Sequence, residues 1–241
     1  MGPGTRGKRR RVGFVLGLVA LAGLLGGLLA QGPASTPSTA RGAFRILQGG
    51  KEVGQEEFEI EWSAEEIRAR AQLTLKVEGK KVEETATLTL SPNYEPRSYE
   101  WKRIKPAGQF VRVQFEGSKA AVEFPSGEET DRREFEFEHT RVVILDNNFF
   151  HHYILLLRQY DFGRGGAQPV RILIPQALWP AVVTLELQGL EEATEKAAGP
   201  SLRKLRMTSE DNEVWLWVDE KAELTRLAAP QAGVEVIRRL P

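Results

Sequence analysis

The feature that most constrains the fold of this chain is a long alternation of apolar and polar residues beginning at Ile67. From Ile67 to Val77 every second residue is apolar, and the residues between them are charged or polar. Successive side chains of a β-strand point to opposite faces, so this spacing predicts a strand with one dry and one wet face. After a turn at residues 79–81 the alternation continues to Leu90, which predicts a β-hairpin.

The same period of two recurs along most of the chain. Mostly short connections separate the alternating segments, which favours antiparallel pairing over parallel crossovers. The segment 214–218 is apolar on both faces and is expected to be central or covered. The other segments that alternate lie at residues 58–62, 111–115, 120–124, 135–137, 170–174, 183–187, 205–207 and 234–236.

One segment breaks this pattern. Asp146, Asn147 and Asn148 can cap a helix, and apolar residues follow at three-to-four spacing up to Tyr160. Because this predicted helix, 147–160, is apolar around most of its circumference, it must be covered widely. The predicted fold is therefore mainly β, a strongly curved antiparallel sheet, or half-barrel, with one main helix packed in or across its concave side.

The N-terminus carries a separate signal. Five basic residues between Arg6 and Arg11 precede eighteen uncharged residues, Gly13 to Ala30. This order predicts a signal peptide or a signal anchor at 1–30, and the positive flank favours export of the chain beyond residue 30. As an apolar transmembrane helix, residues 13–30 would span about 27 Å against a bilayer core of about 30 Å. The membrane is therefore an expected partner.

Cleaved signal and retained anchor both remain open, because the small-residue sites near Ala30 and Ala34 are imperfect. Residues 31–41, rich in proline, serine and threonine, are predicted to be a flexible linker. The remaining residues, 42–241, are predicted to form one antiparallel β domain. The expected location is the cell envelope, on the periplasmic or extracellular side, either anchored in the inner membrane or secreted after cleavage.

Charge and composition exclude several functions. Beyond the basic flank the chain has 28 basic and 33 acidic residues, a net charge of −5, so no nucleic-acid partner is expected. The chain has no cysteine, which excludes thiol chemistry and a lipid-modified N-terminal cysteine. No nucleophile, phosphate-loop or dinucleotide motif is present. We therefore expect neither an enzyme nor a bound cofactor.

The histidines and paired carboxylates do not indicate a site by themselves. Adjacent His151 and His152 would point about 100° apart on a helix, a poor arrangement for shared metal ligation, so no metal is expected. Hydrogen-bonded or solvated histidines at a helix start are the simpler interpretation. The glutamates at 57–61 and 134–138 lie on wet strand faces, where cross-strand pairing with Arg68, Arg70, Lys102 or Arg112 is expected.

Aromatic and large apolar residues suggest where an apolar ligand would bind. Such residues can line a groove in a curved sheet, although an ordinary core is the simpler interpretation for any one of them. The predicted groove residues are Trp62, Trp101, Phe110, Phe149, Phe150, Tyr153, Leu157, Trp215 and Trp217.

Two segments resemble known proteins. Residues 44–56 (FRILQGGKEVGQE) and 217–226 (WVDEKAELTR) resemble hairpins of a set of uncharacterised exported bacterial proteins, and the second is similar to a hairpin of the LolA/LolB-like lipoprotein-carrier half-barrel. The resemblance covers about a quarter of the chain. It implies a curved antiparallel sheet that wraps helical plugs over an apolar cavity. Carrier proteins have more than one plugging helix, whereas this sequence offers one clear candidate.

Two functions are expected from these features. The first is an exported envelope protein of unknown exact role that binds a lipid or another apolar ligand in a half-barrel cavity. The alternative is a membrane-tethered structural or protein-interaction domain with a filled core and no ligand. A ligand cavity needs about 300 Å³ or more, so the volume enclosed by the sheet distinguishes them.

Overall fold

Fifteen strands and one α-helix make up the computed structural model, which describes residues 37–191, 201–210 and 212–239. The first eight strands are β1 (Ser38–Gln48), β2 (Lys51–Trp62), β3 (Ile67–Val77), β4 (Lys80–Leu90), β5 (Pro96–Lys105), β6 (Phe110–Glu116), β7 (Lys119–Ser126) and β8 (Glu129–Glu136). They are followed by β9 (Val143–Ile144), α1 (His151–Leu157), β10 (Ala167–Ile174), η1 (Pro175–Ala177), β11 (Trp179–Glu191), β12 (Leu202–Thr208), β13 (Glu213–Val218), β14 (Leu224–Ala229), η2 (Pro230–Ala232) and β15 (Val234–Arg239).

All fifteen strands belong to one sheet, in the order β8-β7-β6-β5-β4-β3-β2-β1-β15-β14-β13-β12-β11-β10-β9. Neighbouring strands pair antiparallel throughout, except that β9 pairs parallel with β10. The chain thus forms one meander from β1 to β8 and a second from β10 to β15, and β15 joins the two by pairing with β1. The predicted antiparallel, mainly β fold is confirmed.

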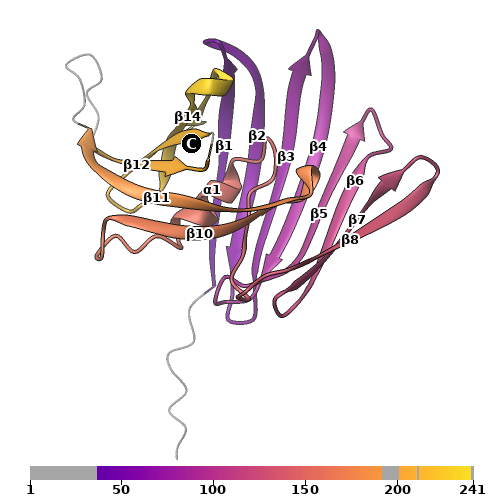
Figure 1. Ribbon diagram of the computed structural model, residues 1–241. Helices are drawn as coiled ribbons and strands as arrows, with labels where there is room; N and C mark the ends of the chain where they lie inside the picture. Colours follow the sequence, from indigo (N-terminus) through magenta and orange to yellow (C-terminus); the bar gives the residue numbers. More distant parts are fainter. Residues whose placement is uncertain (1–36, 192–200, 211, 240–241) are drawn as a thin grey trace, which may run out of the picture. The chain divides into compact units, whose positions relative to one another are not determined.

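The sheet is strongly curved and unclosed (Figure 1). Strands β10 to β15 fold across one face of the β1–β8 half, and α1 lies between the two halves. The two edge strands, β8 and β9, do not pair with each other. The tip of the β10–β11 hairpin, at η1, instead contacts β6. The predicted helix on the concave side of a curved sheet is therefore confirmed.

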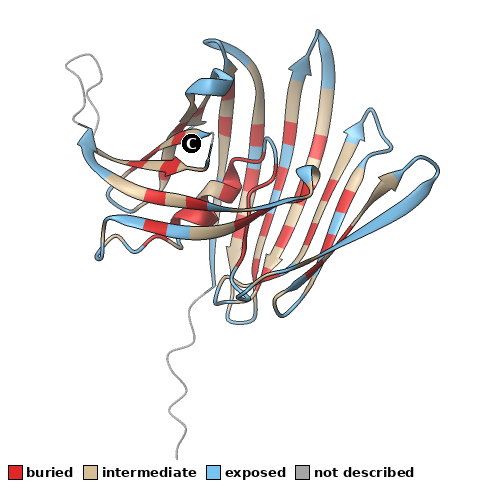
Figure 2. Ribbon diagram, viewed as in Figure 1, coloured by how far each residue is buried: buried red, intermediate tan, exposed pale blue. Residues whose placement is uncertain are grey.

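The alternation in the sequence becomes an inner and an outer face. Ile67, Ala69, Ala71 and Leu73 are buried, as are their cross-strand partners on β4, and the buried bands line the inside of the curve (Figure 2). The inward residues of both meanders and of α1 form a single apolar core. On the outer face Glu59 and Glu61 lie within 4 Å of Arg70, as cross-strand pairing predicts.

Irregular pairing contributes to the curvature. The register shifts within the β1–β2, β4–β5, β11–β12 and β13–β14 pairs, and such bulges bend and twist a strand. Gly54 lies beside the first of these shifts, where β2 approaches β3 closely. A Cβ atom at Gly54 would lie 2.3 Å from the carbonyl oxygen of Thr74. Only glycine fits this position without a backbone shift.

The helix is shorter than the predicted 147–160, because α1 covers only His151–Leu157. Asn148 has a positive φ of 64°, a left-handed conformation that an α-helix cannot contain. The N-cap residue is Phe150, and its side chain makes no capping hydrogen bond. The predicted capping role of Asp146, Asn147 and Asn148 is therefore wrong, and their place is taken by a residue of β2.

At the other end of the described chain, β1 begins at Ser38, inside the segment predicted to be a linker. The predicted signal or anchor at 1–30 lies outside the described residues. Within the part of the chain that the structure describes, no helix combines the length and the apolar character needed to cross a bilayer.

We expect Gly54→Ala to lower the free energy of unfolding by about 1–3 kcal/mol, because the added methyl group would force β2 and β3 apart. Urea unfolding followed by circular dichroism measures this change. Gly163→Ala is the matched control: its Cβ would meet only the carboxylate of Asp161, 3.3 Å away in an exposed loop. Equal losses in the two variants would contradict the packing argument.

Candidate functional site

The structure does not bring the nine predicted groove residues into one groove. Trp101, Phe149, Phe150 and Leu157 are buried in the core, and Trp62 and Tyr153 pack against it. The other three, Phe110, Trp215 and Trp217, point to the outer face. They alternate with inward residues such as Val111 and Leu216, so their position in the strand decides their direction.

The outward tryptophans are covered by cations. The Lys204 ammonium lies 4.3 Å from the centre of the Trp215 ring, and the Arg226 guanidinium lies 4.3 Å from that of Trp217. The indole N–H of Trp217 donates to Glu191 at 2.7 Å. These contacts account for the burial of Trp217 on an outer face.

The space around α1 is filled. Six of the seven residues of α1 are buried. The hollow beside α1, between it and the inner face of β4, measures about 10 Å³ and is lined by residues such as Leu88, Ile144 and Leu155. An apolar ligand needs about 300 Å³ or more, so this hollow does not hold one.

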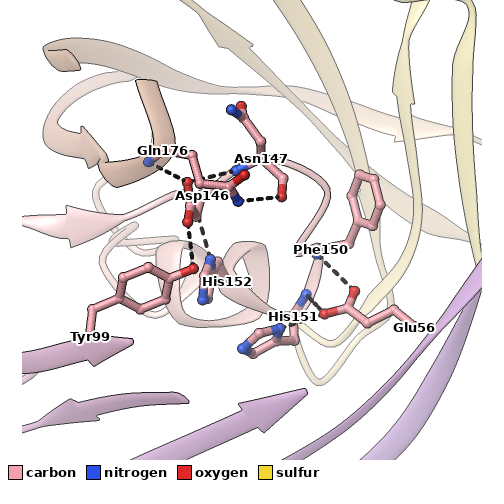
Figure 3. Close-up of polar contacts among 8 residues, drawn as sticks. All are labelled: Glu56, Tyr99, Asp146, Asn147, Phe150, His151, His152 and Gln176. Atoms are coloured by element: carbon pink, nitrogen blue, oxygen red, sulfur yellow. Dashed lines mark hydrogen bonds and ion pairs between the residues drawn. The ribbon is translucent and has the colours of Figure 1, made fainter. Parts of the chain in front are cut away.

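A cluster of polar side chains lies inside this filled core (Figure 3). Glu56 on β2 is fully buried, and its carboxylate faces the start of α1. Its Oε2 accepts a hydrogen bond from the backbone N–H of Phe150 at 2.8 Å, and its Oε1 lies 2.5 Å from Nδ1 of His151. The backbone N–H of His151 also donates to Oε1, at 3.4 Å. A strand residue 94 positions earlier in the chain thus takes the place of a local cap.

The second half of the cluster is built around Asp146. Tyr99 on β5 donates its hydroxyl to Oδ2 of Asp146 at 2.5 Å, while the backbone N–H groups of Asn147 and Gln176 both donate to Oδ1 at 3.0 Å. The backbone N–H of Asp146 donates to Nδ1 of His152 at 3.2 Å. Asp146 therefore joins three elements: the segment before α1, strand β5 and the η1 turn.

The two histidines are adjacent, fully buried and neutral. Their ring centres lie 4.2 Å apart. Because Nδ1 of His152 accepts a hydrogen bond, that ring carries its proton on Nε2. Among the described residues, Nε2 of His151 and Nε2 of His152 have no hydrogen-bond partner. A buried donor without an acceptor costs about 1–3 kcal/mol, so this arrangement lowers the stability of the fold.

Burial shifts the ionisation of every member of the cluster. Desolvation raises the pKa of Glu56 to about 8 and lowers the pKa of His151 to about 3. The pKa of His152 is also well below its usual value through burial, with a smaller contribution from His151. Burial raises the pKa of Asp146, opposed by the hydrogen bond from Tyr99, and raises the pKa of Tyr99 further above neutrality. At neutral pH, Glu56 therefore keeps its proton.

Sequence reasoning missed Glu56, although a signal was present. Glu56 has the same parity as Phe58 and Ile60, which point inward, whereas Glu57, Glu59 and Glu61 point outward. An acidic residue on the dry side of an alternating strand is the signal that could have found it. No such pattern identifies Tyr99 or Asp146, because their meeting depends on how the segment before α1 folds onto β5.

A separate hollow opens at the end of the sheet where β1 begins. It measures about 470 Å³, and an adjoining hollow of about 280 Å³ shares Ser38, Thr39, Trp62 and Ser63 with it. We call the larger one the mouth pocket. Its wall combines apolar and polar side chains, with the Trp62 ring and the guanidinium of Arg158, which follows α1. The lining residues are Ser38, Thr39, Ala40, Trp62, Ser63, Ile67, Pro92, Tyr94, Arg158 and Glu223.

Other hollows offer less. Two of them, about 390 Å³ on β2–β4 and about 550 Å³ on β6–β8, are lined mainly by charged and polar side chains. No group of three or more histidine, aspartate or glutamate side chains that could hold a metal ion occurs in the described ranges.

Comparison with known proteins supports the fold alone. No protein-family model and no curated protein matches this chain. Among solved structures, it is similar to a crystal structure from Brucella abortus, a β-barrel-like protein of a domain of unknown function, DUF1849. The TM-score is 0.55 at 8% sequence identity, over 85% of this chain and 95% of that one. The barrel-like, mainly β architecture is thus shared, while the resemblance to the LolA/LolB-like carriers stays a prediction.

We expect Tyr99→Phe to lower the free energy of unfolding by about 1–3 kcal/mol, because it leaves a buried oxygen of Asp146 without its donor. Denaturant unfolding at constant slope measures the effect. Tyr94→Phe, which removes a hydroxyl from a half-buried tyrosine outside the cluster, serves as the control. If Tyr94→Phe cost as much as Tyr99→Phe, the hydrogen bond to Asp146 would not be the cause.

Proposed function

We propose that this chain is an exported, membrane-attached envelope protein that binds an amphiphilic lipid at the mouth pocket. It is not an enzyme, and its ligand lies at the end of the sheet instead of inside the curve. The observation that carries this proposal is the pocket itself, which has the volume of a small-ligand site at the mouth of a barrel-like sheet.

The chemistry of the pocket supports an amphiphile. Trp62 and Tyr94, both half-buried, offer apolar surface for an acyl chain, and aromatic rings of this kind favour the boundary between hydrocarbon and water. The exposed residue Arg158 lines the same pocket, and a guanidinium suits a phosphate or carboxylate headgroup. Neither feature requires a cavity within the core.

The short covalent connection between the domain and the apolar segment 13–30 also supports the proposal of a lipid ligand. Residues 31–37 link Ala30 to β1, and seven residues span at most about 25 Å even when fully extended. Ser38, Thr39 and Ala40 at the start of β1 line the mouth pocket. If residues 13–30 enter a bilayer, a link this short would keep membrane lipid within reach of the β1 end of the domain.

A second candidate is a structural or protein-interaction domain that binds no ligand. The observation that favours it is the filled interior, in which the hollow beside α1 measures only about 10 Å³. The two candidates differ in what should contact Trp62 in the cell.

Site-specific photocrosslinking separates them. A benzophenone side chain is placed at position 62 of the full chain, which is then irradiated in the membranes of a bacterial host. We expect a lipid adduct on the peptide that contains position 62, detected by mass spectrometry, because the pocket holds an acyl chain there. We further expect Arg158→Gln to lower the yield of adducts that carry an anionic headgroup.

Position 215 provides the matched control, since Trp215 is also an aromatic strand residue but points to the outer face, beside Lys204. The proposal fails if position 62 gives no lipid adduct, or if position 215 gives as much. A protein adduct at position 62 in place of a lipid would support the second candidate.

A further inference from the structure

Two buried glutamates line the inside of the sheet, and they differ in their partners. Glu84 on β4 lies 2.9 Å from the guanidinium of Arg103 and accepts the indole N–H of Trp101 at 3.0 Å. Glu56 on β2 is fully buried, yet no lysine or arginine among the described residues forms an ion pair with it. A buried carboxyl that lacks a cation is costly to ionise.

The contacts of Glu56 tie the sheet to residues 146–160, which we call the plug segment. Its carboxyl meets the backbone N–H groups of Phe150 and His151 and the ring of His151, all within the plug segment. The plug segment is fixed at a second point by Tyr99 through Asp146. Between these two points lie His151 and His152, whose Nε2 atoms lack partners among the described residues.

We propose that Glu56 is a proton-operated latch: the protonated carboxyl holds the plug segment against β2, and the plug segment opens with loss of that proton. The geometry points to this role because, among the described residues, the carboxyl is hydrogen-bonded only to the plug segment. This inference concerns how Glu56 holds the plug segment, so it does not depend on a lipid being bound in the mouth pocket.

The direction of the pH effect is set by burial. In the closed state the pKa of Glu56 is about 8, whereas a solvated glutamate has a pKa of 4.5. Between these values, opening releases one proton, so a rise in pH favours the open state by roughly tenfold per pH unit. Above about pH 8 the closed state is also ionised, and the dependence on Glu56 ends.

The histidines act in the opposite direction at acid pH. Both are neutral when buried, and each would take up a proton on opening below its usual pKa of 6.5. Asp146, whose pKa burial raises, releases a proton on opening and so acts in the same direction as Glu56. Tyr99 stays protonated throughout. The plug segment is therefore expected to loosen as the pH rises above about 6.5, and its acid behaviour is set by opposing groups.

Two charged groups near the cluster, in the part of the chain that the structure describes, have ion-pair partners of their own. Glu84 on β4 is bound to Arg103. Arg238 on β15 lies 5.7 Å from the ring centre of Phe58, next to the cluster, and forms an ion pair with Glu223 at 3.0 Å. These pairs do not involve the plug segment, so Glu56 is the group whose removal isolates the proposed effect.

Hydrogen exchange of the full chain in detergent micelles, from about pH 5 to about pH 9, tests the latch. The opening constant of amides in α1 is compared between the wild type and Glu56→Gln, which keeps the shape of the side chain, one oxygen acceptor and a donor, but cannot ionise. We expect the ratio of wild-type to variant opening constants to rise roughly tenfold per pH unit up to about pH 8, and then to level off. The ratio cancels the pH dependence that the two proteins share. Because the replacement also changes the neighbour of His151, the slope above about pH 6.5, where the histidines are neutral in both states, is the part that reports Glu56.

Glu57→Gln is the matched control, because Glu57 is the next residue of β2 and is exposed on the outer face. We expect it to behave as the wild type at every pH. The proposal is overturned if Glu56→Gln also behaves as the wild type, or if wild-type α1 opens no more readily at pH 8 than at neutral pH. It is also overturned if amides of β3 and β4 open in parallel with α1, since opening would then be global. The wild-type profile suffices for two of these outcomes even if a variant fails to fold.

Discussion

The structure depends on filling the concave side of a sheet that curves but does not close. Fifteen strands in one sheet present a long apolar inner face, and the edges β8 and β9 are not joined by pairing. The plug segment covers this face with the buried residues of α1 and with Phe149 and Phe150. Without the plug segment, the apolar side chains that it covers on the two meanders would be exposed to water.

The same segment brings polar groups into the core, and their placement is specific. Glu56 and Tyr99 reach from two different strands and engage opposite ends of the segment that precedes and starts α1. Apolar contacts alone would allow a short helix to slide or rotate, whereas hydrogen bonds to particular backbone N–H groups fix one position. Among the described residues the Nε2 atoms of His151 and His152 have no hydrogen-bond partner, which offsets part of the gain from these hydrogen bonds.

Because the space around α1 is filled, the end of the sheet where β1 begins is the better candidate for ligand binding. The mouth pocket and the plug segment share a boundary, because Arg158 lines the pocket and directly follows α1. Any displacement of the plug segment would therefore move one wall of the mouth pocket. A barrel-like fold shared with a domain of unknown function is compatible with many activities, so the pocket and the cluster carry the functional argument.

The sequence by itself determined the mainly β class, the antiparallel meander and the single inner helix, because a period of two and a period near four are local properties. It also determined the outer pairing of Glu59 and Glu61 with Arg70, since parity assigns all three to one face. The sequence-based prediction of Trp215 and Trp217 as groove residues used only the size of their side chains. Their positions in the alternating strand, which assign them to the outer face, were not taken into account. Tertiary structure decided the rest: Asn148 adopts a left-handed conformation that shortens the helix, and a strand 94 residues away supplies its cap. The curvature of the sheet brings β2, β5 and the plug segment together and so decides which buried groups are in contact. No local sequence pattern specifies this curvature.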